Sequence, residues 1–259
     1  MKSKNKLAVY ACLSSIRKLF LSPLFLLSCL GCTAALFVVV VEQLPEIMTT
    51  LKGEFFPPET VEKLIKTAIC SDAFYFVLPL LSALVQSSAF LRELESGFCR
   101  SVLPRCGKHG KHRYLLQKFF SCIVSGGAVP TIGYLLFRII LPMIFPVSQT
   151  KGESTPIFTT CLLLFLFGAF CSLVGMTASV CFRQSYIALL SPFILCFFPV
   201  ILRERYFEET FVIDPRTWIS PDVEKWFCGE YGPAVLMGGF IILFGCLFSL
   251  FSRRRLSRL

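Results

Sequence analysis

The residue types that could hold a metal ion fall in one short basic stretch. Cys99, Cys106, His109 and His112 follow the spacing C-x6-C-x2-H-x2-H, and these histidines are the only two in the chain. Zinc sites use cysteine and histidine ligands, but this spacing matches no common zinc finger. Lysines and an arginine lie among the histidines and disfavour a bound cation. The pattern therefore favours a solvated basic loop with no metal site.

Residue sets for catalysis are equally weak. Glu208 and Glu209 form a carboxylate pair, but no arginine follows in the next turn, which favours a solvated charge pair. Because both histidines lie in one loop, no Ser/His/Asp set can assemble within the apolar segments. Neither HExxH nor a glycine-rich phosphate loop with Lys-Ser/Thr occurs. The sequence predicts no catalytic residues, no bound cofactor and no ATP site in this chain.

The elements that must position these residues are mostly apolar. The 259-residue chain is 55% hydrophobic with a mean hydropathy of +0.70, well above the values of soluble domains. We expect an all-α membrane protein, a single domain over residues 1–259, with no cleaved signal peptide. Its six transmembrane helices are expected near residues 24–41, 73–91, 115–145, 157–181, 187–202 and 232–251.

Prolines mark two of these spans. The third carries Pro130, Pro142 and Pro146, and we expect it to be broken there; the shorter fifth carries Pro192 and Pro199. Neighbouring helices must satisfy the backbone groups that a proline frees, so both spans should face protein or a cavity.

Charge sets the predicted orientation. The N-terminus, the 92–118 loop, Arg183 and the C-terminal tail hold 17 of the 26 Lys and Arg, but only two of the 16 acids. Basic loops stay in the cytoplasm. We therefore expect both termini in the cytoplasm of a multi-pass plasma-membrane protein. The net charge of +10 follows this topology and indicates no nucleic-acid partner.

Segments outside the spans also have predicted roles. Residues 6–20 have helical apolar spacing, typical of an interfacial helix, although a continuous extension of the first span also fits. The outer loops are expected at about 42–72, 146–156 and 203–231, with a surface helix near 57–66. The aromatic residues of the last loop suit an interfacial belt or a lid over a cavity. Cys70 and Cys228 lie outside the spans, and either a disulfide or two thiols fits the sequence.

Few polar residues lie within the spans. Arg138 falls near the outer interface, where snorkelling explains it. Gln86, Ser87 and Ser88 form the main polar cluster, which suits helix–helix hydrogen bonding or contact with a substrate. Buried carboxylates are absent from the predicted spans, which disfavours an ion-coupled carrier.

The layout and two motifs resemble the type-2 family of ABC exporter permeases. The stretch from Arg92 to Gly97 reads RELESG, Leu103-Pro104-Arg105 follows, and residues 113–118 read RYLLQK. They are similar to the family's E-x-x-x-SG … R-x-x-YL-x-x-K pattern, with Glu93 and Glu95 offering two registers. Residues 183–193, RQSYIALLSPF, resemble the family's entry to its fifth span.

The resemblance implies a partner permease and two ATP-hydrolysing subunits, which would carry ATP and Mg²⁺. A coupling loop at about 92–114, beside the interfacial helix, would dock on the ATPase through Arg92, Glu93, Glu95, Arg100, Arg105 and Arg113. We expect an exporter of a peptide, a drug-like compound or another amphipathic molecule. The substrate path would include Gln86, Ser87, Ser88 and Ser191, between the second and fifth spans and matching helices of the partner. A non-transporting scaffold or assembly protein is the alternative.

Overall fold

The computed structural model describes residues 20–51, 58–97, 107–145, 157–207, 210–219, 226 and 229–256. Within these ranges every regular element is helical, and six helical segments are long and apolar enough to cross a membrane. This confirms the predicted helical fold and the predicted number of spans. The predicted interfacial helix at 6–20 and the outer loop at 146–156 lie outside the described residues, except for Phe20.

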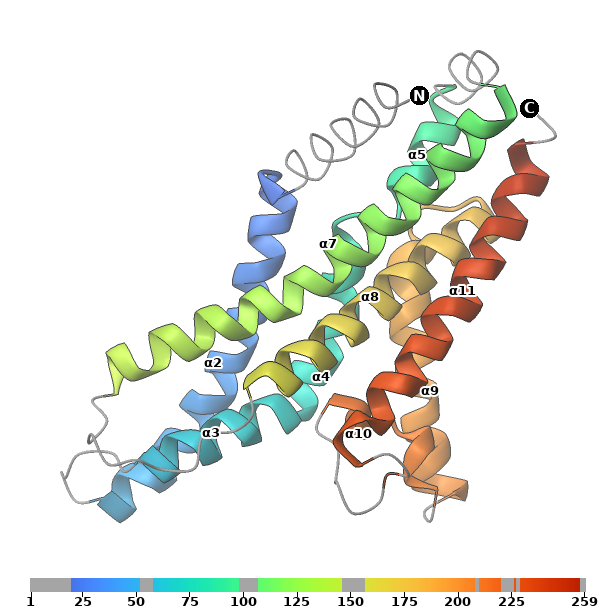
Figure 1. Ribbon diagram of the computed structural model, residues 1–259. Helices are drawn as coiled ribbons and strands as arrows, with labels where there is room; N and C mark the ends of the chain where they lie inside the picture. Colours follow the sequence, from blue (N-terminus) through green and yellow to red (C-terminus); the bar gives the residue numbers. More distant parts are fainter. Residues whose placement is uncertain are drawn as a thin grey trace.

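The six spans alternate in direction (Figure 1). They are α2 (Pro23–Leu51), α4 (Asp72–Leu84) continued by α5 (Ala89–Glu95), α7 (Gly107–Ile144), α8 (Ile157–Phe182), α9 (Ile187–Tyr206) and α11 (Gly232–Leu256). Shorter elements connect them: α3 (Pro58–Cys70), η2 (Phe211–Ile213), α10 (Arg216–Ile219) and η4 (Gly229–Tyr231).

The bundle has two chemically different ends. One holds α5, the first turns of α2 and α7 and the last turns of α8 and α11, and we call it the α5 end (Figure 1, top). The other holds α3, α10 and the last turns of α9, and we call it the α10 end. The described basic residues gather mainly at the α5 end and the acidic ones at the α10 end, as the charge distribution predicts.

Helix α8 is the centre of the bundle and packs against α4, α7, α9 and α11. Small residues allow its closest contact with α7. A Cβ added to Gly168 would lie 2.4 Å from the Gly126 carbonyl oxygen and 2.7 Å from Pro130 Cγ. Close backbone approach of this kind is typical of packed transmembrane helices.

The prediction that prolines break the third span is wrong. Helix α7 runs continuously through Pro130 and Pro142 and also begins eight residues before the predicted start. Pro130 lacks the N–H that would bind the Gly126 carbonyl, and Gly168 packs directly against that carbonyl. Close packing against α8 around this position stabilises α7 as a helix despite the lost hydrogen bond.

The second span, predicted as one helix, is interrupted instead. Residues 85–88 form a turn between α4 and α5. The turn contains the polar cluster Gln86-Ser87-Ser88, and the Ser87 hydroxyl donates to the Ala83 carbonyl oxygen. Serine side chains that bind the preceding turn compete with the helix backbone and often bend it.

The predicted outer loop at 42–72 is largely helical. Helix α2 continues through Pro45 to Leu51, and α3 confirms the predicted surface helix. Arg138 of α7 donates to Glu62 of α3 at 2.8 Å and to the Tyr134 hydroxyl at 3.0 Å. Arg138 therefore connects α3 to α7 through an ion pair, a contact that snorkelling alone did not predict.

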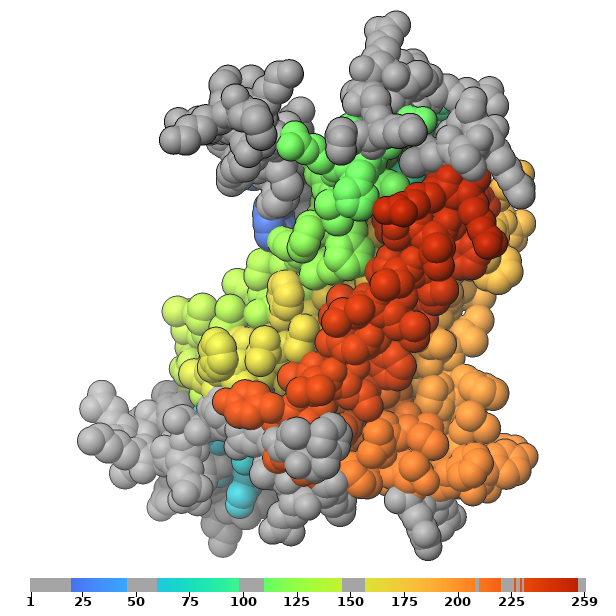
Figure 2. Space-filling view, turned by 45° about the vertical axis from the view of Figure 1, so that its right-hand side comes forward, coloured from blue at the N-terminus to red at the C-terminus, as the bar shows by residue number. Residues whose placement is uncertain are grey.

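Helices α9 and α11 contribute least to the core. Figure 2 shows α11 (red) lying along the surface with no other helix over most of its length. Its exposed side chains include Ile242, Leu243 and Leu250, and those of α9 include Ile194 and Phe198. Lipid or a second membrane protein must cover these apolar faces.

Candidate functional site

The predicted coupling residues divide between α5 and α7. Arg92, Glu93 and Glu95 lie on α5, and Arg113 lies in the first turns of α7. Arg92 and Glu95 are exposed, while Glu93 is partly buried. Arg100 and Arg105 lie outside the described residues.

Glu93 is the centre of a polar cluster between α5 and α7. Its Oε1 pairs with Lys118 Nζ, and its Oε2 accepts a hydrogen bond from the Tyr114 hydroxyl. The ammonium of Lys118 also lies 5.7 Å from the centre of the Tyr114 ring. We call these three residues the Glu93 cluster. It assigns Glu93 rather than Glu95 to the contact with α7.

A separate hydrophobic cluster lies beside these polar contacts. Phe90 of α5 packs with Leu115 and Cys122 of α7, with three residues of α8 and with Phe248 of α11. The ring centres of Phe90 and Phe248 are 5.3 Å apart in an edge-on arrangement. Three helices, α7, α8 and α11, therefore hold α5 through a small apolar cluster that is distinct from the main core.

Gly97 sets the end of α5. The helix closes at Ser96, and the next residue, Gly97, has φ of +75°. Glycine adopts this left-handed conformation without the steric cost that a Cβ brings, and it commonly follows the last residue of a helix. The Ser-Gly pair of the motif is therefore a helix-termination signal that fixes where α5 ends.

The predicted path residues of the second span are packed inside this chain. Ser87 is 1% exposed, and its carbonyl accepts a hydrogen bond from Ser179 of α8 at 3.2 Å. A Cβ added to Gly175 would lie 3.0 Å from Ser87 Cβ and 2.2 Å from the Ala188 carbonyl oxygen. The turn thus occupies a tight contact with α8 and the start of α9. Its hydrogen bond to α8 uses the Ser87 backbone carbonyl, while the Ser87 hydroxyl bonds within its own segment.

The other polar residues of this region have distinct surroundings. Gln86 is buried, and Ser88 accepts a hydrogen bond from Arg92 Nη2 at 2.7 Å. Arg92 thereby joins α5 to the turn that precedes it. Ser191 lies on α9, and its buried hydroxyl has no hydrogen-bond partner. The role of all four residues in a substrate path stays a prediction.

The second and fifth spans touch directly toward the α10 end. The Tyr75 hydroxyl of α4 donates to the Cys196 carbonyl oxygen of α9 at 3.0 Å. Phe76 lies against Phe193 and Phe197, whose own rings stack with centres 5.7 Å apart. A path between these helices would require this aromatic contact to open.

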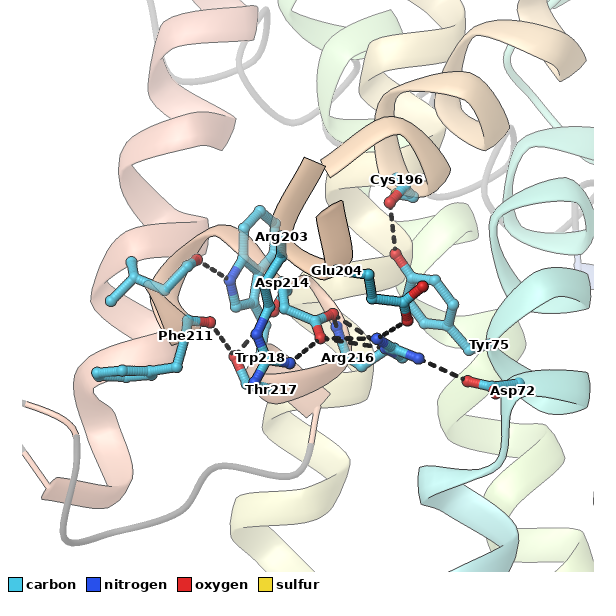
Figure 3. Close-up of polar contacts among 11 residues, drawn as sticks. Asp72, Tyr75, Cys196, Arg203, Glu204, Phe211, Asp214, Arg216, Thr217 and Trp218 are labelled. Atoms are coloured by element: carbon cyan, nitrogen blue, oxygen red, sulfur yellow. Dashed lines mark hydrogen bonds and ion pairs between the residues drawn. The ribbon is translucent and has the colours of Figure 1, made fainter. Parts of the chain in front are cut away.

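The α10 end holds a denser ion-pair cluster, which Figure 3 shows around Asp214 and Arg216. Asp214 is 1% exposed and accepts bonds from the Arg203 guanidinium, the Arg216 guanidinium and the Arg216 backbone N–H. Arg216 also pairs with Asp72 at 3.0 Å and Glu204 at 2.8 Å. We call these five residues the α10-end cluster.

This arrangement keeps Arg216 charged. Burial alone lowers the pKa of the Arg216 guanidinium, but its bonds to Asp214, Asp72 and Glu204 outweigh burial and raise that pKa. The cluster therefore joins α4, α9 and α10 through an arginine that stays protonated over any physiological pH.

Aromatic residues complete the α10 end. Trp218 Nε1 donates to the Val212 carbonyl oxygen at 2.9 Å, and its ring stacks on Phe240 of α11. Trp226 packs edge-on against Phe211. Both tryptophans are buried, so neither belongs to an interfacial belt; the exposed Tyr206 and Phe207 fit one better.

The α10-end cluster was not predicted from the sequence. Four of its residues lie between positions 203 and 216, but Asp72 is distant in the chain, and the only signal was that all five fall in or next to predicted outer loops. Within the described residues, no group of three potential ligands could hold a metal ion. Cys99 and Cys106 lie outside those residues, as do the Glu208–Glu209 pair and Cys228, while Cys70 has a free thiol.

Comparisons with protein-family models, with curated proteins and with solved structures find no match to this chain. Its functional interpretation therefore depends on the geometry above and on the sequence motifs.

Proposed function

We propose that this chain is the membrane-spanning subunit of an ATP-driven ABC transporter. It would export a peptide, a drug-like compound or another amphipathic molecule, powered by a separate ATPase subunit that holds ATP and Mg²⁺. A second permease, identical or related, would complete the transport unit in the plasma membrane, with the α5 end and both termini in the cytoplasm.

The Glu93 cluster is the observation that carries this proposal. Its members are the glutamate, tyrosine and lysine of the motif that resembles the exporter family, and they meet across 25 residues of sequence. They hold α5 against α7, so a force on the exposed face of α5 would reach the longest helix of the bundle. A loop must be rigidly attached in this way to transmit a displacement from an ATPase.

The break at residues 85–88 supports the same mechanism. It separates α5 from α4, so a displacement of α5 need not pass along one continuous helix to α4, which is bound to α9. Exposed apolar faces on α9 and α11 provide surfaces for a second permease. Substrate would pass beside the second and fifth spans, at the face that a partner permease covers.

The test begins with the complex itself. The chain, purified with its native complex in mild detergent, is expected to bring down an ATP-binding cassette ATPase. Reversing Arg92, Arg100 and Arg105 to glutamate should weaken this association and the stimulation of ATP hydrolysis, because desolvated charge pairs at an interface contribute a few kcal/mol. Reversing Lys63, Lys66 and Arg205, which are exposed at the α10 end, makes the same charge change far from the loop and serves as the control.

Two results would contradict the proposal. If no ATPase accompanies the chain, the alternative of a scaffold or assembly protein gains support. If the 92–105 triple variant stimulates hydrolysis as well as the unmodified chain does, the loop has no coupling role. Melting temperature and membrane insertion are measured for both variants, so that a folding defect is recognised.

A further inference from the structure

A basic hollow lies at the α5 end between the last turns of α8 and α11. It has a volume of about 260 Å³ and is lined by Val180, Cys181, Arg183, Phe251, Arg254 and Arg255. Three of the six lining residues are arginines, and none is a carboxylate. A water molecule needs only about 10–15 Å³ measured in this way, so the hollow can admit a much larger group.

Two arginines have unusual local constraints. Arg255 Nη2 donates to the Cys181 carbonyl oxygen at 3.0 Å, which ties the end of α11 to the last turn of α8. Arg183 follows α8 with φ of +60° and is the only described residue other than glycine with positive φ. Glycine is favoured at this position after a helix, so keeping arginine there costs conformational energy. Such an outlier at a basic hollow suggests that the side chain has a function.

The lining combines two kinds of surface. Val180 and Phe251 provide apolar walls that continue into the membrane-spanning helices, and the neighbouring Phe182 is 63% exposed. The arginines lie at the ends of those helices. Because α8 has 26 residues, it is about 39 Å long and slightly exceeds the hydrocarbon core. Its last turn therefore lies at the level of the lipid headgroups.

We propose that this hollow binds the phosphate of an anionic phospholipid. Guanidinium groups match phosphate oxygens in geometry and charge, and basic pockets between transmembrane helices are typical headgroup sites. The acyl chains would lie against the exposed Phe182 and along the exposed apolar face of α11. This inference needs only the membrane-spanning fold and does not rest on the proposed coupling to an ATPase.

Native mass spectrometry of the full-length chain tests the site. The protein is exchanged into detergent with either phosphatidylglycerol or phosphatidylcholine, and the retained lipid is counted. We expect one tightly held phosphatidylglycerol and little phosphatidylcholine. Each arginine near a membrane surface contributes about 1 kcal/mol, or about fivefold in affinity. Arg183→Gln and Arg254→Gln should each lower phosphatidylglycerol affinity about fivefold, whereas the exposed Arg253→Gln, outside the lining, should not.

Arg183→Gly separates binding from folding. Glycine accepts the backbone conformation at this position, so the melting temperature should not fall, while the phosphatidylglycerol affinity should fall as in Arg183→Gln. Equal retention of phosphatidylglycerol by this variant and by the unmodified chain would overturn the proposal.

A competition experiment with inorganic phosphate distinguishes a lipid phosphate from a free phosphate ion. Inorganic phosphate at millimolar concentration should not displace the lipid, because it lacks acyl chains. Full displacement, or stabilisation by phosphate alone, would show a free-anion site and overturn the lipid assignment. Loss of ATPase association in Arg183→Gly, with lipid retention unchanged, would assign the hollow to a protein partner instead.

Discussion

At the α10 end, Arg216 joins carboxylates of α4, of α9 and of the turn before α10, and Trp218 stacks on α11, whereas at the α5 end one glutamate joins only α5 to α7. The acceptor at the α10 end, Asp214, is almost fully buried, while Glu93 and Lys118 are both partly open to solvent. The α5 end also contains the break in the second span. The two ends therefore differ in how firmly their helices are joined.

The two ends should therefore differ in how easily their helices separate. A buried carboxylate with three donors resists separation of its helices, because any movement leaves charge uncompensated in a poorly solvated site. A small apolar cluster and one partly exposed ion pair can rearrange at lower cost. We infer that the helices separate more easily at the α5 end than at the α10 end.

The largest expected effect on stability is from Arg216→Met. It leaves Asp214 buried with Arg203 as its remaining guanidinium partner, and breaking a buried ion pair costs about 3–5 kcal/mol. Because Arg216 is partly exposed, we expect a loss near 3 kcal/mol in the free energy of unfolding, measured by denaturant titration in detergent micelles. The exposed Arg205→Met is the matched control and should change the free energy by less than about 0.5 kcal/mol.

The pH dependence of this effect has a predicted sign. The raised pKa of Arg216 means that its stabilisation is fully present below the ordinary arginine pKa and is lost only as pH rises through the higher folded value. The difference in stability between the unmodified chain and Arg216→Met should contain no contribution from arginine titration between about pH 6 and about pH 9. A difference that disappears by about pH 9 would show that another group controls the cluster.

The next effect tests the packing around the break. Gly175→Ala places a Cβ 2.2 Å from the Ala188 carbonyl oxygen, and overpacking of this kind costs about 1–3 kcal/mol. A Cβ added to Gly238 would have no neighbouring atom within 4 Å. Gly238→Ala should therefore be neutral or stabilising by up to about 1 kcal/mol. Melting temperatures of the two variants give the comparison, and equal values would show that the α8–α9 contact adapts freely.

Tryptophan scanning sharpens the proposed substrate path. Ser87→Trp should lower expression and melting temperature, because Ser87 is packed between α8 and the start of α9. Ser191→Trp, at a partly exposed position on α9, should block transport while ATP hydrolysis persists. If a stable Ser191→Trp variant still transports substrate, Ser191 does not line the path. If Ser87→Trp still transports substrate, Ser87 does not line it either.

The smallest effect on stability is expected from Glu93→Gln. The ion pair with Lys118 is partly exposed, so its loss should cost about 1 kcal/mol or less. Stimulation of the partner ATPase should fall much further, because α5 would lose its ion pair with α7 and keep only the apolar contacts. Hydrogen exchange should show faster exchange in residues 89–95 than in residues 211–219, and the variant should widen that difference. If hydrogen exchange in α5 is unchanged in the variant, the Glu93 cluster does not hold this helix in place.

The long apolar runs determined the number and approximate position of the spans. A segment of about 20 apolar residues has few stable alternatives to a membrane-spanning helix, so length and hydropathy suffice to predict it. The surface helix α3 was also predictable from Pro58 and the acids that follow it. The motif residues Glu93, Tyr114 and Lys118 were identified as important, but their mutual contact was not.

Only the tertiary structure decided which helices are broken and which charges meet. Helix α7 continues through Pro130 where it packs closely against α8, whereas the second span breaks at residues 85–88, a turn that contains no proline. Asp214 and Arg216 are neighbours in the chain, but Asp72 meets them from another span, and its distance in sequence carries no information about that contact. Local composition decides whether a segment is apolar enough to span a membrane, but a continued helix and a paired charge depend on what the neighbouring helix places beside them.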